Sequence, residues 1–462
     1  MTSTIPSPPE TSTAAEPRVG LWLFFVGTAA LVVSLAQTIL IPVLGLLPDK
    51  LDTSVANVQW LLTATLLVAA VAVPLMGRLG DMFGKRLLLL VAVGALVIGS
   101  VITALSSSIG VLIFGRAIQG ISAAAIPLGI SLLSSLVPRE RAGTAIATVS
   151  AMLGVGGALG LPLAAAIAQN SDYHVLFWVT AGASALAFVG ILTVVPKDTQ
   201  LAGGKVDYVG TVLLGAALVS LLYPLSQTAS WGWGSTKVIG LLSLSAVLFV
   251  IFTFTQTRIA QPLVDLVTLR RRPIMLTNIA SIFFGFALFA SLIGTASYVQ
   301  APEATGYGFG SSIMTGGLAM LPGGLAMLVL APIAAKLADR FGAPRILTFG
   351  ALIVAVGWLC RIVFIDSLTQ VVIGATIVGA GTAIGYATMP AIINAHTPVS
   401  ELAAANGVNS LVRSVGSSLA SAVGGALLAA TTMSLGGHDI PDPRRLPRGA
   451  SPCALAPRSS RQ

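Results

Sequence analysis

The chain has 462 residues, of which 55% are hydrophobic and only 9% are charged, and its formal net charge is +9. So few charged side chains argue against a soluble globular fold, because they cannot cover a water-facing surface. The basic residues lie in short loops between apolar runs, not in a patch interleaved with aromatic residues, which argues against a nucleic-acid partner. The expected surroundings of the chain are a lipid bilayer.

Residues 1–19 are rich in Ser, Thr and Pro and carry Glu10, Glu16 and Arg18. A cleaved signal peptide would begin with basic residues followed by a short apolar core. The composition instead predicts a disordered cytoplasmic tail ahead of a retained first span.

The apolar runs that follow are long and continuous and lack the alternation of a membrane β-barrel, so they predict helices. A span needs about 20 apolar residues, and this criterion predicts about thirteen spans. They start near Gly20, Val58, Leu87, Gly110, Gly143, His174, Tyr208, Lys237, Pro273, Ser311, Pro344, Leu368 and Leu402. The expected fold class is an all-α polytopic membrane protein.

The basic loop residues fix an expected orientation. If the N-terminus is cytoplasmic, nearly all of them fall in cytoplasmic loops, and the outside loops keep only Lys50 and Lys237. The sequence therefore predicts a multi-pass protein of the cell's inner (plasma) membrane with a cytoplasmic N-terminus.

Two loop segments are similar to each other. Residues 77–86 read GRLGDMFGKR after the second span, and residues 335–345 read AKLADRFGAPR after the tenth. Such repetition predicts two related halves. The expected division is a six-helix half at 20–196, two linker spans with a cytoplasmic linker at 197–272, and a C-terminal half at 273–432 with about five spans, its sixth missing. An irregular tail rich in Pro and Arg, at 433–462, would follow.

Residues 77–86 resemble the loop between spans two and three of the major facilitator superfamily. Its fourth-span motif is similar to a set formed by Arg116, Gln119, Gly120 and Pro127. The exporter motif of its fifth span resembles Gly156, Gly160 and Pro162, with Leu161 inserted before the proline.

Further similarity at residues 60–85, 207–210, 261–266 and 409–413 indicates the fourteen-span drug/proton antiporter branch of that superfamily. The resemblance extends over residues 20–435. It implies a major-facilitator fold and proton-coupled multidrug efflux by alternating access.

We call residues 77–86 the latch loop; its named members are Gly77, Arg78, Gly80, Asp81, Gly84, Lys85 and Arg86. A carboxylate such as Asp81 can cap backbone N–H groups at the positive end of a helix, and the glycines permit a close approach. The loop is expected to lock one conformation, or, in the alternative, to act as a static helix cap and orientation signal. By the repeat, a weaker second latch would comprise Asp339, Arg340, Gly342 and Arg345.

Arg116 is a cation inside a span, where a functional role is the default interpretation. The resemblance implies proton coupling through Arg116, Gln119 and Gly120, and the alternative is an arginine that reaches the outer interface. Arg361, near the outer end of the eleventh span, is expected to reach that interface.

Glycines and a proline in the fifth span, Gly156, Gly160 and Pro162, permit close packing or bending. They predict either a sliding interface between the halves or ordinary packing of small residues.

Polar residues inside spans are the candidates for a central cavity: Gln37, Thr38, Asn278, Asn406, Asn409 and Arg413. The antiporter branch commonly carries an Asp in its first span, but Ala36 occupies the matching position here. No other Asp or Glu is expected well inside a span, so proton coupling is implied by the resemblance alone.

The favoured function is export of small amphipathic or cationic compounds, with protons as partners; uniport or uptake of a neutral solute and an inactive transporter remnant are the alternatives. The motifs of metal sites, nucleophile elbows and phosphate loops are absent, so we expect no enzyme activity, metal or cofactor. A monomer in the bilayer with a small-molecule substrate is expected.

The residues after 438 are rich in Pro and Arg, which are unfavourable in a membrane helix. An odd number of spans would also place these arginines outside, against the orientation of the other loops. We therefore expect a shifted reading frame near residues 439–443 and the loss of a fourteenth span.

Overall fold

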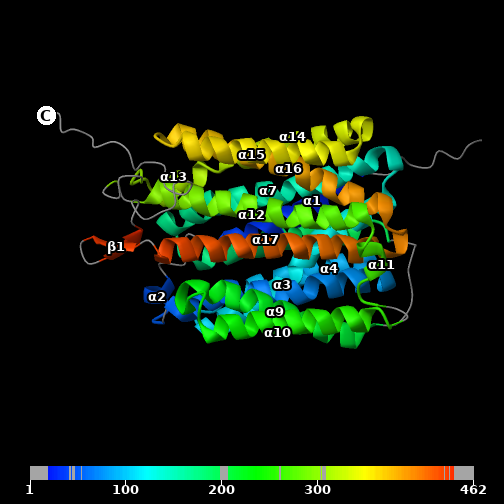
Figure 1. Cartoon of the computed structure of the whole chain (residues 1–462), viewed down its shortest axis with the longest axis horizontal. Coiled ribbons are helices and arrows are strands. Elements are labelled where there is room, and N and C mark those ends of the chain that lie inside the picture. The colour runs from blue at the N-terminus through cyan, green and yellow to red at the C-terminus, as the bar shows by residue number, and fades with distance from the viewer. Residues whose placement is uncertain are drawn as a thin grey trace, which may run out of the picture.

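The computed structural model describes residues 19–40, 43, 47–53, 55–197, 206–259, 262–301, 303, 308–430, 432–435 and 438–441. Its long helices lie side by side along one direction (Figure 1). They are α1 (Val19–Thr38), α3 (Val55–Phe83), α4 (Lys85–Ala104), α5 (Ile109–Gly120), α6 (Ala125–Leu136), α7 (Arg139–Asn170), α8 (His174–Val194), α9 (Tyr208–Trp231), α10 (Thr236–Gln256), α12 (Arg272–Gln300), α14 (Leu321–Phe341), α15 (Ala343–Val363), α16 (Leu368–His396) and α17 (Leu402–Ala430). The shorter elements are α2 (Leu47–Lys50), η2 (Ile121–Ala124), α11 (Leu266–Leu269), α13 (Ile313–Leu318) and η4 (Val399–Glu401).

Among the described residues, 12 spans are long and apolar enough to cross a membrane. These confirm the predicted all-α membrane fold. A further long helix, α17, packs against α3, α9 and α12 within the bundle and carries polar residues along its length, among them Asn406, Asn409 and Arg413.

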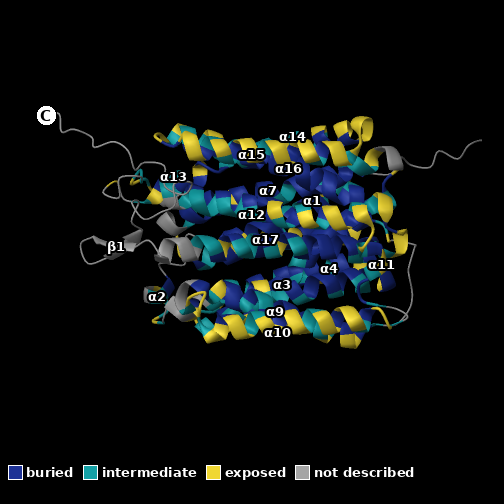
Figure 2. Cartoon of the chain, in the orientation of Figure 1, coloured by how far each residue is buried: buried dark blue, intermediate teal, exposed yellow. Residues whose placement is uncertain are grey.

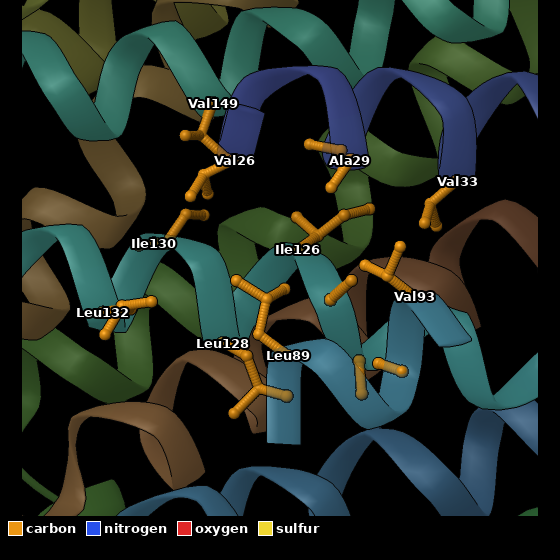
Figure 3. Packing of buried hydrophobic residues seen from close by; sticks show 14 of the residues in the cluster. Val26, Ala29, Val33, Leu89, Val93, Ile126, Leu128, Ile130, Leu132 and Val149 are labelled. Carbon is orange, nitrogen blue, oxygen red and sulfur yellow. The ribbon is translucent and has the colours of Figure 1, made fainter. Parts of the chain in front are cut away.

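Apolar side chains fill the space between helices and also cover the outside of the bundle. Val26, Val33, Leu89, Ile126 and Val149 meet in one buried cluster formed by α1, α4, α6 and α7 (Figure 3). Figure 2 shows buried residues at the centre and exposed residues along α10 and α15. Because the hydrocarbon of a bilayer is itself apolar, exposed side chains such as Phe24 and Val250 suit contact with lipid.

Equivalent contacts recur in the two parts of the chain. In α7, a Cβ atom added to Gly156 would overlap the carbonyl oxygen of Leu31 in α1. In α17, a Cβ added to Gly416 would overlap the carbonyl oxygen of Ile282 in α12. Glycine is needed at both positions because the helix backbones approach too closely for a larger residue. This repeated packing is the pattern that two related halves would produce.

The two parts differ in how α4 and α15 are covered. Both α6 and α8 pack against α4 and α1, whereas α16 is the one helix of the described residues that packs closely against both α15 and α12. Accordingly, 28% of the residues in the apolar stretch of α15 are buried, compared with 61% of those in α4. α9 and α10 pack together, and α9 contacts α3 and α17 at the lower edge of Figure 1.

Two short strands lie in the segment where an irregular tail is expected from residue 433. β1 (Thr432–Leu435) and β2 (His438–Pro441) form an antiparallel pair in which Met433 opposes Ile440. The rest of the tail, and the N-terminal tail expected at 1–18, lie outside the described residues.

Gly156→Ala should lower thermal stability, because the added methyl group would overlap the α1 backbone; overpacking of this kind costs about 1–3 kcal/mol. The matched control is Gly182→Ala in α8, where an added Cβ meets nothing within 4 Å. Thermal unfolding of the detergent-solubilised protein, monitored by size-exclusion chromatography, measures the difference. Equal melting temperatures for the two variants would contradict this account of the α1–α7 contact.

Candidate functional site

The latch loop joins the N-terminal helices α1 to α8 to the C-terminal helix α17. Asp81 lies in the last turn of α3 and is buried. Its two carboxylate oxygens accept hydrogen bonds from the backbone amides of Ala403 and Ala404, at 3.2 and 2.9 Å. These amides belong to the first turn of α17, where a helix cannot satisfy its own N–H groups. Asp81 is therefore a helix cap supplied by a distant part of the chain.

Lys85, the first residue of α4, completes this contact. Its Nζ lies 3.6 Å from the Asp81 carboxylate and donates to the carbonyl oxygen of Val399 at 3.4 Å. Both side chains of the ion pair are buried. Gly77 permits the approach, because a Cβ there would lie 2.8 Å from the carbonyl oxygen of Ala403. Gly84 has a φ of 112°, which favours glycine and lets α4 start directly after α3.

Arg86 ties the latch loop to another helix of the N-terminal part. Its guanidinium donates to the carbonyl oxygen of Leu192 at 2.5 Å, in the last turn of α8. Arg78 Nε is buried without a hydrogen-bond partner in the described part of the chain.

The predicted second latch has a related position but fewer contacts. Asp339 lies at the end of α14, and its carboxylate approaches Gly143 near the start of α7, so that a Cβ on Gly143 would lie 3.5 Å from both oxygens. Asp339 is exposed, unlike Asp81. Gly342 has a φ of 90°, as expected for the counterpart of Gly84. The guanidinium of Arg340 lies over the ring of Phe341, and Arg345 donates to the Phe341 carbonyl at 3.5 Å.

Asparagines form a second set of contacts between the N-terminal and C-terminal helices, near the latch loop. Asn406 donates to Ser131 of α6 at 3.3 Å and to Asn394 of α16 at 2.6 Å. Asn394 also donates to Ser134 of α6 at 2.8 Å. These bonds join α16 and α17 to α6.

Three residues predicted to line the cavity lie elsewhere. Asn409 donates to Asn278 and Ser281 of α12, at 3.0 and 2.6 Å. Neither it, Asn278 nor Asn406 is among the residues that line the cavity. The polar face of α17 is continuous in sequence, but its first half is covered by α6, α12 and α16, and only the part from Ser410 onward borders open space.

A cavity of about 280 Å³ lies between the N-terminal and C-terminal helices. The residues that line it lie farther along the helices than the asparagine contacts, on the side away from the latch loop. Of the predicted site residues the lining includes Gln37, Thr38, Arg116, Gln119, Gly120 and Arg413. It also includes Thr65, a polar residue inside a span that was expected to line a cavity, and residues that were not predicted, namely Ser291, Thr295, Tyr386, Ser410, Ser414, Ser417 and Ser421. The serines of α17 recur at helical spacing beside Arg413, and this periodicity could have identified them.

Arg116 is fully enclosed and does not reach the outer interface. Its guanidinium donates to the carbonyl oxygens of Ala36 at 3.0 Å and Leu61 at 3.2 Å, and to Gln119 Oε1 at 2.8 Å. Gln119 in turn donates to Ser100 at 2.9 Å. One planar side chain thereby joins α1, α3 and α5. The 3₁₀ turn η2 follows directly after Gly120 and interrupts the helix of the fourth span.

The position of the Arg361 side chain differs from the predicted one. It was expected to reach the interface, but it is buried and donates to Thr295 at 2.8 Å and Ser291 at 3.4 Å, both in α12. Its guanidinium lies over the ring of Trp358. Hydroxyl partners on the neighbouring helix hold the charge inside the protein, which hydropathy alone does not indicate.

The small residues of the fifth span divide between two faces. Gly154 and Pro162 of α7 contact α14 and α13 in the C-terminal part, where added Cβ atoms on Gly154 and Gly317 would meet Met327 and Pro162. Gly156 and Gly160 instead face α1, against Leu31 and Thr38. Only the first face can serve as an interface between the two parts of the bundle.

No bound ion is needed to explain this geometry. Within the described residues, His, Cys, Asp and Glu side chains do not gather into a group that could hold a metal. The charged lining residues of the cavity are Arg116 and Arg413, and the rest of the lining is hydroxyl, amide and apolar. The arrangement can hold a small molecule.

Comparison with known proteins identifies the family. The Tetracenomycin C resistance and export protein of Streptomyces glaucescens is 27% identical over 411 residues, covering 88% of this chain and 75% of that protein. The Multidrug resistance protein Stp of Mycobacterium tuberculosis (strain CDC 1551 / Oshkosh) is 27% identical over 422 residues, covering 89% and 75%.

Two solved structures share the fold. The human organic anion transporter MFSD10 aligns with a TM-score of 0.63 at 16% identity, over 89% of this chain and 94% of that one. The proton:xylose symporter XylE aligns with a TM-score of 0.60 at 14% identity, over 87% of both chains. The profile of the Major Facilitator Superfamily matches residues 26–327 and 282–435 of this sequence. The chain belongs to the major facilitator superfamily.

Proposed function

We propose that the protein is a secondary transporter that exports small amphipathic compounds by alternating access, coupled to protons. The observation that carries the proposal is the cavity between α1–α8 and α12–α17, which is closed at one end by the Asp81 contact with α17. A binding space between two helix sets, with separable contacts at its end, is the arrangement that alternating access requires. We treat the two helix sets as the two halves.

The relatives support efflux as the direction of transport. Two of them carry names that refer to export or to multidrug resistance. We further propose that the latch-loop end faces the cytoplasm of the cell's inner (plasma) membrane, since Arg78, Lys85 and Arg86 lie there. The cavity then opens outward, and the described conformation is the outward-facing one.

A second candidate is uniport or uptake of a neutral solute. The observation in its favour is that no Asp or Glu is among the residues lining the cavity. A buried carboxylate is the simplest intramembrane proton carrier, and Ala36 contributes only its backbone carbonyl at the position where the antiporter branch carries Asp. An imposed pH gradient separates the two candidates, because only the coupled transporter responds to it.

Transport itself tests the proposal, with Asp81→Asn as the informative variant. Cells that express the wild-type chain should survive toxic amphipathic compounds better than cells without it, and a pH gradient should drive the same compound into inverted membrane vesicles. Asp81→Asn removes the charge that favours the α17 helix end, so transport should fall about fivefold or more while membrane insertion is unchanged.

Asp339→Asn is the matched control for that experiment, because this carboxylate is exposed and should matter less. Wild-type transport by Asp81→Asn would contradict the role of the latch loop. An absence of gradient-driven movement for every compound tried would contradict coupled export.

Arg116→Lys keeps a positive charge but loses the planar group that donates to three acceptors. We expect its transport rate to fall about tenfold, close to the loss in Arg116→Ala. Arg258→Lys, at an exposed position after α10, serves as the control for the substitution itself. Full activity of Arg116→Lys in the vesicle assay would show that only the charge matters.

We also propose that the chain belongs to the fourteen-span drug/proton antiporter branch of the superfamily. The support is that α9 and α10 pack against each other beside the two halves, with α9 in contact with α3 and α17.

A further inference from the structure

The charges of the cavity are all of one sign. Of the residues lining it, Arg116 and Arg413 are basic and none is acidic. Both arginines are buried. Charges in such a space interact more strongly than in water, because the surrounding protein and lipid have a low dielectric constant. A cationic compound would be repelled there, whereas an anionic compound would be attracted.

The two arginines differ in how many of their N–H donors already make hydrogen bonds within the protein. The Arg116 guanidinium donates to Ala36, Leu61 and Gln119, so its donors are largely engaged by the protein. Arg413 makes one side-chain hydrogen bond within the described residues, from Nη2 to Ser410 at 3.0 Å. A guanidinium has five N–H donors. Arg413 therefore retains the capacity to bind an incoming acceptor.

Tyr386 orients the Arg413 side chain. The guanidinium carbon lies 4.7 Å from the centre of the Tyr386 ring, and Tyr386 is itself buried in α16. Stacking on an aromatic face holds the planar group in one orientation without using its donors. Ser414 and Ser417 of α17 border the same space and offer further hydroxyl donors.

Apolar side chains form most of the remaining wall. Four of the residues that line the cavity together with Arg413 are Leu66, Leu222, Phe289 and Met320. A wall of this kind suits the apolar body of a ligand, with a few polar groups to fix its orientation.

Deepening the proposed transport function, we infer that the substrates are amphipathic organic anions, and that Arg413, stacked on Tyr386, binds their carboxylate or sulfonate group. This narrows the amphipathic or cationic compounds expected from the sequence to amphipathic anions. Arg413 is thus a specificity residue, and Arg116 chiefly joins α1, α3 and α5.

Three ligands with one fluorescent body test the charge preference: dansylglycine, which is anionic; dansylamide, which is neutral; and a dansyl derivative with a trimethylammonium group. Their dissociation constants are measured by dansyl fluorescence with the purified full-length protein in neutral detergent. Dansylglycine should bind at least about tenfold more tightly than the cationic derivative. Equal affinities, or tighter binding of the cation, would overturn the inference.

Arg413→Gln should weaken dansylglycine about tenfold and leave dansylamide within about twofold. The matched control is Arg361→Gln, which removes the same charge from a buried position in α15. The Arg361 guanidinium donates to Ser291 and Thr295 of α12, and Arg361 is not among the residues that line the cavity. This variant should preserve the ratio of the two affinities. The same loss of that ratio in both variants would contradict the specific role of Arg413.

The wild-type ligand series keeps the test decisive even if Arg413→Gln does not fold. It also separates the inference from the proposed function, because binding in detergent does not require transport. Transport of the cationic derivative but not of dansylglycine would leave export intact and overturn the anion preference. Tight anion binding without any movement in vesicles would support the preference and contradict transport.

Discussion

The first turn of α17 presents backbone N–H groups that the helix cannot satisfy by itself, and the carboxylate of Asp81 satisfies two of them. An unpaired buried amide costs about 1–3 kcal/mol, so the two helix sets can separate at this end only if water or another acceptor replaces Asp81. Lys85 adds a counter-charge to the same carboxylate. The closed end of the cavity depends on this contact, and the accessibility of the cavity depends on the closed end.

Movement between conformations also needs an interface that can slide. The face of α7 that carries Gly154 and Ala158 meets Met327 and Gly324 of α14 across the two helix sets. Gly324 and Ala158 bring the two helices close together, and Gly154 leaves space for the flexible, unbranched side chain of Met327. The opposite face of α7, at Gly156, packs onto α1 and belongs to one set only. One helix therefore combines a fixed contact with a contact that can change, which is what rigid-body motion of two halves requires.

The electrostatics of the cavity connect substrate choice to coupling. A transporter that binds cations in a bilayer would normally place a carboxylate beside them. Here the lining offers Arg413 stacked on Tyr386, and Arg116 is bound to the backbone carbonyls of Ala36 and Leu61. An anionic substrate would itself supply the negative charge that the cavity lining lacks.

Sequence alone determined the membrane class of this protein and most of its helix boundaries, because long apolar runs have few physical interpretations. It also singled out the latch loop and Arg116 as candidates, because clustered glycines and a charge inside a span are unusual. It could not determine the partner of Asp81, which lies 322 residues away at Ala403. Nor could it separate Asn406 and Asn409, buried at the closed end, from Arg413 in the cavity, or show that Arg361 has partners on α12. In a bilayer the helix faces that contact lipid and those that contact protein are both apolar, so periodicity shows where a face lies but not which neighbour covers it. Only the packing of the helices decided that.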